Sequence, residues 1–165
     1  MFGWKPCIWQ VLPITKNYPN DLDAADVRHF LFMGVMTLAA TRLIPMRKNK
    51  GKSIGACLHN HTSYIQNPDK TAQGELVSSY QCSPLTVDEE FLLTKRLYEQ
   101  TTGRSQKSDV IAYQVRQSFK PGEVTPEEAN RIGYEFAERF LKGKHAFIVA
   151  THPHRPGAHP QPHYL

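Results

Sequence analysis

A run of basic residues is the first feature of this sequence that could do chemistry. Between residues 27 and 68 there is no Asp or Glu. Six basic residues fall inside this stretch: Arg28, Arg42, Arg47, Lys48, Lys50 and Lys52. Cations concentrated in this way attract phosphates, so the run predicts contact with nucleic acid, and a basic surface that only faces water is the alternative. The net charge of +5 and the pI of about 9.2 agree with an anionic partner without requiring one.

Histidines and cysteines are the other residues that could do chemistry. Their spacing predicts neither a histidine metal site in the tail nor a cysteine metal site. Three histidines lie near the end of the chain: His154, His159 and His163. The prolines between them prevent a regular strand or helix from aiming their rings at one point. The three cysteines are far apart and include no C-x-x-C pair: Cys7, Cys57 and Cys82. This pattern is neither a disulfide framework nor a zinc ribbon, and it favours a reducing cytoplasm.

The sequence predicts no membrane segment. Residues 30–40 are uncharged, but a run of 11 residues is too short to cross a bilayer. Acidic residues precede the run, so it lacks the basic leader of a signal peptide. We therefore expect a cytoplasmic protein.

The middle of the chain alternates between strand-like and helix-like segments. We expect strands at 41–46, 76–82, 110–119 and 145–151, and helices at 52–66, 86–100 and 125–143. Capping boxes at Thr86 and Thr125, each with a glutamate three residues later, mark two of the helix starts. In strand 110–119, alternation places most apolar side chains on one face (Ile111, Tyr113, Val115 and Phe119) and Gln114 and Arg116 on the other. This order predicts an α+β fold in which helices cover one face of a sheet.

Two segments carry a resemblance to a known family. Residues 109–152 read DVIAYQVRQSFKPGEVTPEEANRIGYEFAERFLKGKHAFIVATH, and residues 53–71 end in Tyr-Ile-Gln-Asn-Pro-Asp-Lys-Thr. Together they resemble the N-terminal nuclease domain of relaxases from plasmids and conjugative transposons. The resemblance covers about residues 36–152. It implies an antiparallel sheet palm of the His-hydrophobe-His endonuclease type.

The resemblance also implies roles for two residues. A relaxase nicks one DNA strand when a tyrosine oxygen attacks the scissile phosphate and stays covalently attached. Tyr64 stands in the family's first motif and would be this nucleophile, although a phenol with an ordinary pKa of about 10 needs a base or a metal nearby. His152 stands where the family places the first histidine of its metal triad, so a divalent ion, magnesium or manganese, is implied. Without the resemblance, Tyr64 is a half-buried aromatic at a helix end and His152 is an exposed histidine at a strand end.

Binding partners follow from the same resemblance. The DNA-binding residues are expected to be Arg42, Arg47, Lys48, Lys50 and Lys52 of the basic run, with Arg116 of the family's middle motif. A purely structural role is the alternative for Arg116. The family acts on a single strand at a transfer origin with an accessory mobilisation protein. His59 and His61 match no ligand of the family, so we expect them at the surface.

Both ends of the chain fall outside the resemblance. We expect residues 1–35 to be a non-family N-terminal extension, with an acidic helix-like run at 20–32. An over-long gene start, with initiation near Met33 or Met36, would explain it, and a small docking segment is the alternative.

Residues 153–165 lose all hydrophobic periodicity. Read one base later, their degenerate codons can spell His-Ile-Asp-Arg-Ala-His-Ile-His-Asn-His-Ile, which is the kind of string that the family places after Val-Ala-Thr-His. We therefore expect that a frameshift truncates the nuclease domain, residues 36–152, before its metal-binding strand. The strand at 145–151 would then keep an exposed edge that invites aggregation.

These observations predict the N-terminal fragment of a mobilisation relaxase. By family it would be a DNA-nicking enzyme, but the missing part of the metal motif predicts an inactive one. A catalytically inactive DNA-binding fragment is the alternative function, and a pseudogene product without function is a third.

Overall fold

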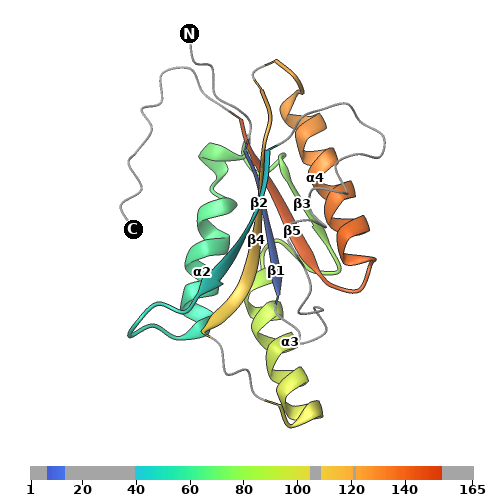
Figure 1. Ribbon diagram of the computed structural model, residues 1–165. Helices are drawn as coiled ribbons and strands as arrows, with labels where there is room; N and C mark the ends of the chain where they lie inside the picture. The colour runs from blue at the N-terminus through green and yellow to red at the C-terminus, as the bar shows by residue number, and fades with distance from the viewer. Residues whose placement is uncertain (1–6, 14–39, 105–108, 121, 154–165) are drawn as a thin grey trace.

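The computed structural model describes residues 7–13, 40–104, 109–120 and 122–153 (Figure 1). Its elements are β1 (Cys7–Pro13), β2 (Ala40–Arg47), α2 (Ile54–Ile65), the short 3-10 helix η1 (Pro68–Lys70), β3 (Val77–Tyr80), α3 (Val87–Thr102), β4 (Val110–Ser118), α4 (Pro126–Leu141) and β5 (Phe147–His152). The helix-like run at 20–32, the alternative starts Met33 and Met36, and residues 154–165 lie outside the described residues. None of the helices in the described residues has the length and apolar character that a bilayer crossing requires.

The described strands form one five-stranded sheet in the order β2-β4-β1-β5-β3. All four neighbouring pairs run antiparallel. Helices and an antiparallel sheet in this arrangement confirm the α+β class that the sequence predicted.

The centre of the sheet is filled from the N-terminal segment. β1 lies between β4 and β5 (Figure 1). Its residue Cys7 lies opposite Ser118 of β4 and opposite His152 of β5. Since β5 also pairs with β3, both of its edges are hydrogen-bonded. The expectation that this strand keeps an exposed edge is therefore corrected. The family resemblance implied a neighbour supplied by the residues that follow β5, whereas the neighbour comes from residues 7–13.

Helices lie on both faces of the sheet, which corrects the expectation of a single covered face (Figure 1). Phe147 and Val149 of β5 pack with α4, while Ile148 and Ala150 pack with α2 and α3. All four side chains are fully buried. An uninterrupted apolar run of this kind is typical of a strand that is covered on both sides, because successive side chains point to opposite faces.

A bulge in β4 changes one of the predicted faces. Met46 pairs with Ala112 and Arg47 with Val110, so Ile111 has no direct partner in β2. The extra residue shifts Ile111 to the core beneath α2 and α3, whereas Val115 packs against α4. Strict alternation had placed Ile111 and Val115 on the same face.

The two predicted capping boxes have different outcomes. At α4 the box is confirmed, because the Thr125 hydroxyl accepts from the Glu128 N–H at 3.2 Å and the Glu128 carboxylate accepts from the Thr125 N–H at 2.9 Å. At α3 it is wrong, because the Thr86 side chain caps no backbone group and instead donates to Glu90 at 2.6 Å. A capping side chain reaches the first turn of a helix when its own backbone is extended. Thr125 has this extended backbone, with ψ of 162°, whereas Thr86 has ψ of 13° and does not.

Candidate active site at the end of the sheet

The fold brings Tyr64 and His152 into contact. Tyr64 lies in the last turn of α2, and His152 is the final residue of β5. Their ring centroids are 6.3 Å apart and the ring planes meet at 72°, so the contact is edge-to-face. Tyr64 is 36% exposed, which leaves the tyrosine accessible to a ligand from solvent. The two residues singled out by the family resemblance thus form one site.

A carbonyl group at the end of α2 orients His152. Nε2 of its ring lies 2.7 Å from the carbonyl oxygen of Ile65. A carbonyl only accepts, so Nε2 carries the proton and Nδ1 holds the lone pair when the ring is neutral. Burial lowers the pKa of His152; the bond to Ile65 opposes this shift, and the charge of Lys70 adds to it. The result is a half-buried, neutral imidazole with a fixed tautomer, which is how metal-binding histidines are commonly held.

Lys70 is a third member of the site that the sequence analysis did not single out. Its Nζ lies 3.9 Å from the centroid of the Tyr64 ring, on one face of it. η1 brings it there, because Asn67 caps the start of η1 and its side chain accepts from the N–H of Asp69 at 2.9 Å. The Asn-Pro pair after the tyrosine was the available signal, since it forces the following residues to turn back toward the helix end.

His61 lies one turn before Tyr64 and is half-buried, which corrects its expected surface position. Burial, and then the positive charge of Arg116, lower the pKa of His61 to about 4. His59 is exposed as expected, and its Nδ1 lies 2.8 Å from a carboxylate oxygen of Asp88. Arg116 is also half-buried. Because its charge acts on His61, Arg116 lies beneath α2, close to the candidate site.

Strand register places Arg42 beside Arg116. The two residues are direct partners across β2 and β4. Arg116 lies two positions before Ser118 in β4, and Ser118, Cys7 and His152 lie side by side across β4, β1 and β5. Directly opposed residues of antiparallel strands project to the same face, so both arginines share the face of His152. Like charges opposite one another repel, and an anion bound between them would relieve this cost.

The other predicted DNA-binding residues lie at the far end of α2. Arg47 forms an ion pair with Asp109, and Lys48, Lys50 and Lys52 are exposed between β2 and α2. A helix of 12 residues is roughly 18 Å long, so these lysines do not border Tyr64. The basic run is thus divided between two ends of one helix.

The described residues supply one candidate metal ligand. His152 has the chemistry and the hydrogen bond of such a ligand. In the part of the chain that the structure describes, no three His, Cys, Asp or Glu side chains gather as a metal site would require. His154, His159 and His163 lie outside that part. The described residues therefore fit one ligand position and not a complete metal site.

Comparisons with known proteins bear on both residues of the contact. The family model described as "Relaxase: MobA/VirD2-like, nuclease domain" matches residues 64–163, a range that includes Tyr64 and His152. That family generally uses a divalent metal. The matched range also includes most of the residues that carry the predicted frameshift. No solved structure matches the chain.

Curated relatives match part of the chain. It is 30% identical over 122 residues to a group II intron-interrupted relaxase, LtrB, of Lactococcus lactis subsp. cremoris, which is 62% of this chain and 22% of that protein. It is 48% identical over 59 residues to a Protein rlx of Staphylococcus aureus, covering 35% of this chain and 18% of the relative. The chain thus spans about a fifth of the length of the curated relatives that it matches.

Proposed function

Because the chain belongs to the MobA/VirD2-like relaxase nuclease family, we propose that its Tyr64 nicks single-stranded DNA through a covalent phosphotyrosyl intermediate. The observation that carries the proposal is the contact between Tyr64 and His152, whose rings approach to 6.3 Å from elements far apart in the sequence. An exposed tyrosine beside a neutral imidazole and a lysine is the arrangement that such a reaction needs.

The reaction is a transesterification at phosphorus. The phenolic oxygen of Tyr64 loses its proton and forms a bond to the phosphorus, while the bond from phosphorus to the 3′ oxygen breaks. One piece of DNA leaves with a free 3′ hydroxyl, and the other stays joined to Tyr64 through its 5′ phosphate. Lys70, on the face of the Tyr64 ring, would attract the phosphate to this position.

His152 would hold a divalent ion, magnesium or manganese, which when bound neutralises charge that develops on the phosphate. The bond to Ile65 leaves Nδ1 as the ligand atom. The remaining ligands would come from outside the described residues, in line with the proposal that the chain is the front portion of a longer relaxase. Residues 36–152 would be the nuclease domain, with the extension 1–35 adding the central strand β1 to its sheet and the frameshifted tail 153–165 following it.

Arg42 and Arg116 would bind the DNA backbone beside this site. They face each other across β2 and β4, on the face of His152. The substrate would be a single strand at a transfer origin, presented in the cytoplasm with an accessory mobilisation protein. These partners come to the proposal from the family.

The test is the capture of a covalent adduct. The chain is incubated with manganese and with single-stranded oligonucleotides of random sequence labelled at the 3′ end, so that the label stays on the piece joined to Tyr64. Wild type is expected to give a labelled band that survives denaturation, and Tyr64→Phe none. Tyr98→Phe, on α3, is the matched control and should keep the band.

The second candidate is a DNA-binding fragment without nicking activity. The incomplete set of metal ligands among the described residues favours it. It predicts salt-dependent binding of the same oligonucleotides by wild type and by Tyr64→Phe alike, with no covalent band from either. A band from wild type that persists in Tyr64→Phe would contradict both candidates.

A further inference from the structure

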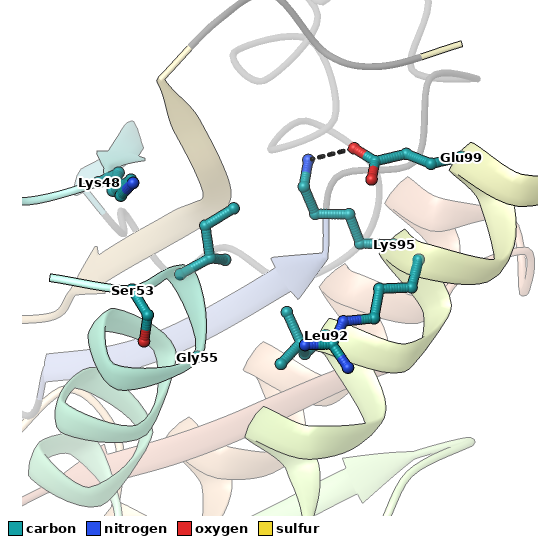
Figure 2. Close-up of a pocket in the computed structure, with 8 residues that line it drawn as sticks. Lys48, Ser53, Gly55, Leu92, Lys95 and Glu99 are labelled. Atoms are coloured by element: carbon teal, nitrogen blue, oxygen red, sulfur yellow. Dashed lines mark ion pairs between the residues drawn. The ribbon is translucent and has the colours of Figure 1, made fainter. Parts of the chain in front are cut away.

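A cavity of about 380 Å³ lies between the start of α2 and the middle of α3, away from Tyr64 (Figure 2). Figure 2 shows Lys48 on one side of it and Lys95 with Glu99 on the other. Its floor is partly apolar, formed by Ile54 and Leu92. Ligand sites commonly have a volume of this order and combine apolar walls with a few charged groups.

The position of Gly55 permits the two helices to approach at this cavity. A Cβ atom on Gly55 would lie 3.2 Å from Cδ2 of Leu92, closer than side chains normally pack. Gly55 therefore lets the first turn of α2 reach α3 without displacing Leu92. Ser53 begins α2 at the cavity, where its hydroxyl accepts from the N–H of Ala56 at 3.1 Å.

The charge of the cavity is positive. Lys48, Lys95 and Arg96 line it, and Glu99 is the one acidic residue among the described residues that do so. The Lys95 side chain is only 12% exposed and its Nζ lies 3.6 Å from Glu99. The positive end of the α2 dipole adds to this field, since the first turn of α2 has no acidic residue.

We propose that this cavity binds a backbone phosphate of the DNA strand, as a second anchor at the end of α2 opposite Tyr64. The proposal rests on the proposed function and extends it. Lys50 and Lys52 are exposed and lie in the sequence between Lys48 and Ser53, which both line the cavity, so they add positive charge to this connection. A small anion would bind only in the cavity. A DNA strand can run along α2, which is roughly 18 Å long, and contact both the cavity at its start and Tyr64 at its end. Basic residues of the β2–α2 connection and of α3 would thus meet the strand at the start of α2, and the candidate nucleophile would meet it at the end.

The test measures binding in the Tyr64→Phe background, where no covalent step interferes. Fluorescence anisotropy gives the Kd of a labelled oligonucleotide long enough to cover both ends of α2, at several salt concentrations. Arg96→Ala is expected to weaken binding about fivefold and to lower the salt slope by about 0.7, the value for one phosphate contact of a single strand. Arg131→Ala, on the exposed side of α4, removes the same charge elsewhere and should change neither value.

Glu99→Gln provides a change of opposite sign. Removing the carboxylate from the cavity is expected to tighten binding about threefold, a result that a damaged fold would not produce. An Arg96→Ala effect equal to that of Arg131→Ala, or weaker binding in Glu99→Gln, would overturn the proposal. Absence of a covalent band from wild type, with these binding differences intact, would overturn only the nicking activity.

Discussion

The two faces of the sheet differ in what they bury. Against α4, the core is aromatic: the rings of Tyr80 and Phe147 stack with centroids 5.3 Å apart, and Tyr134 meets Phe147 edge-on at 5.2 Å. Against α2 and α3, the core is mostly aliphatic, with Phe91 as the one aromatic ring among the described residues of its buried cluster, and it gives way to His61 and Arg116 toward the end of the sheet. The candidate chemistry is therefore restricted to one face, while the other is devoted to packing.

β5 shows how one strand serves both purposes. Its alternate residues Phe147 and Val149 pack against α4, while Ile148 and Ala150 face α2 and α3 and lead to His152 on the same side. The rigid packing on one face can thus hold the histidine of the other in place. A side chain in a well-packed strand keeps its position more closely than one on a loop.

The largest expected effect comes from breaking the aromatic face. Phe147→Ala should lower the free energy of unfolding by about 3–5 kcal/mol, because Phe147 is fully buried and its loss leaves a cavity. Urea denaturation followed by circular dichroism measures this change. Ile148→Val, on the opposite face of the same strand, should cost only about 0.5–1.5 kcal/mol. Ile148→Val removes a single methyl group, so a loss for Phe147→Ala no larger than this would contradict the packing described for Phe147.

A smaller effect is expected from protonation on the other face. The folded state lowers the pKa of His61 from 6.5 to about 4, so below pH 6.5 the unfolded chain binds a proton that the folded chain does not. Stability from this group is thus present above pH 6.5, falls as the pH drops, and levels off near pH 4. Between pH 7 and pH 5 the loss is about 2 kcal/mol.

His61→Gln tests this value because glutamine does not titrate. Urea unfolding at both pH values should show a fall between pH 7 and pH 5 that is smaller in the variant by about 2 kcal/mol. The same pH dependence in wild type and variant would mean that His61 is not held neutral on the buried side of α2.

The smallest expected effect compares two helix starts. Thr125→Ala removes a side-chain cap of α4 and should cost about 1 kcal/mol. Thr86→Ala leaves the backbone bonds of α3 unchanged and should cost less than about 0.5 kcal/mol. Thermal unfolding of the two matched variants measures the difference, and a larger loss for Thr86→Ala would contradict the assignment of the caps.

Local signals in the sequence were enough for most of the elements. Pro126 after Thr125 marked the start of α4, and Gly103 and Gly143 followed the ends of α3 and α4. The central position of β1 could not be predicted in this way. A strand of seven residues reveals nothing locally about which strands it will join, since its partners lie at least 99 residues later in the sequence.

The candidate site was predictable in its members and not in its geometry. Tyr64 and His152 were identified by resemblance, but only the fold shows that His152 meets the end of α2. The burial of His61 did have a signal in the sequence. His61 follows Cys57 by four residues and Leu58 by three, so it continues the buried stripe of α2.

The position of β1 also governs the order in which this protein can fold. Cys7 must find Ser118 and His152, so the middle of the sheet closes only after nearly the whole described chain has been synthesised. Contacts of such high sequence separation slow folding, because the chain loses the entropy of loop closure before strand pairing contributes any favourable free energy. On the ribosome, residues 7–13 would emerge before the other described strands and stay unpaired until β4 is made. β5, the last of the described strands in the sequence, would then pair with β1 and β3. We therefore expect slow folding in which β1, although it precedes the other described strands, is among the last of them to pair.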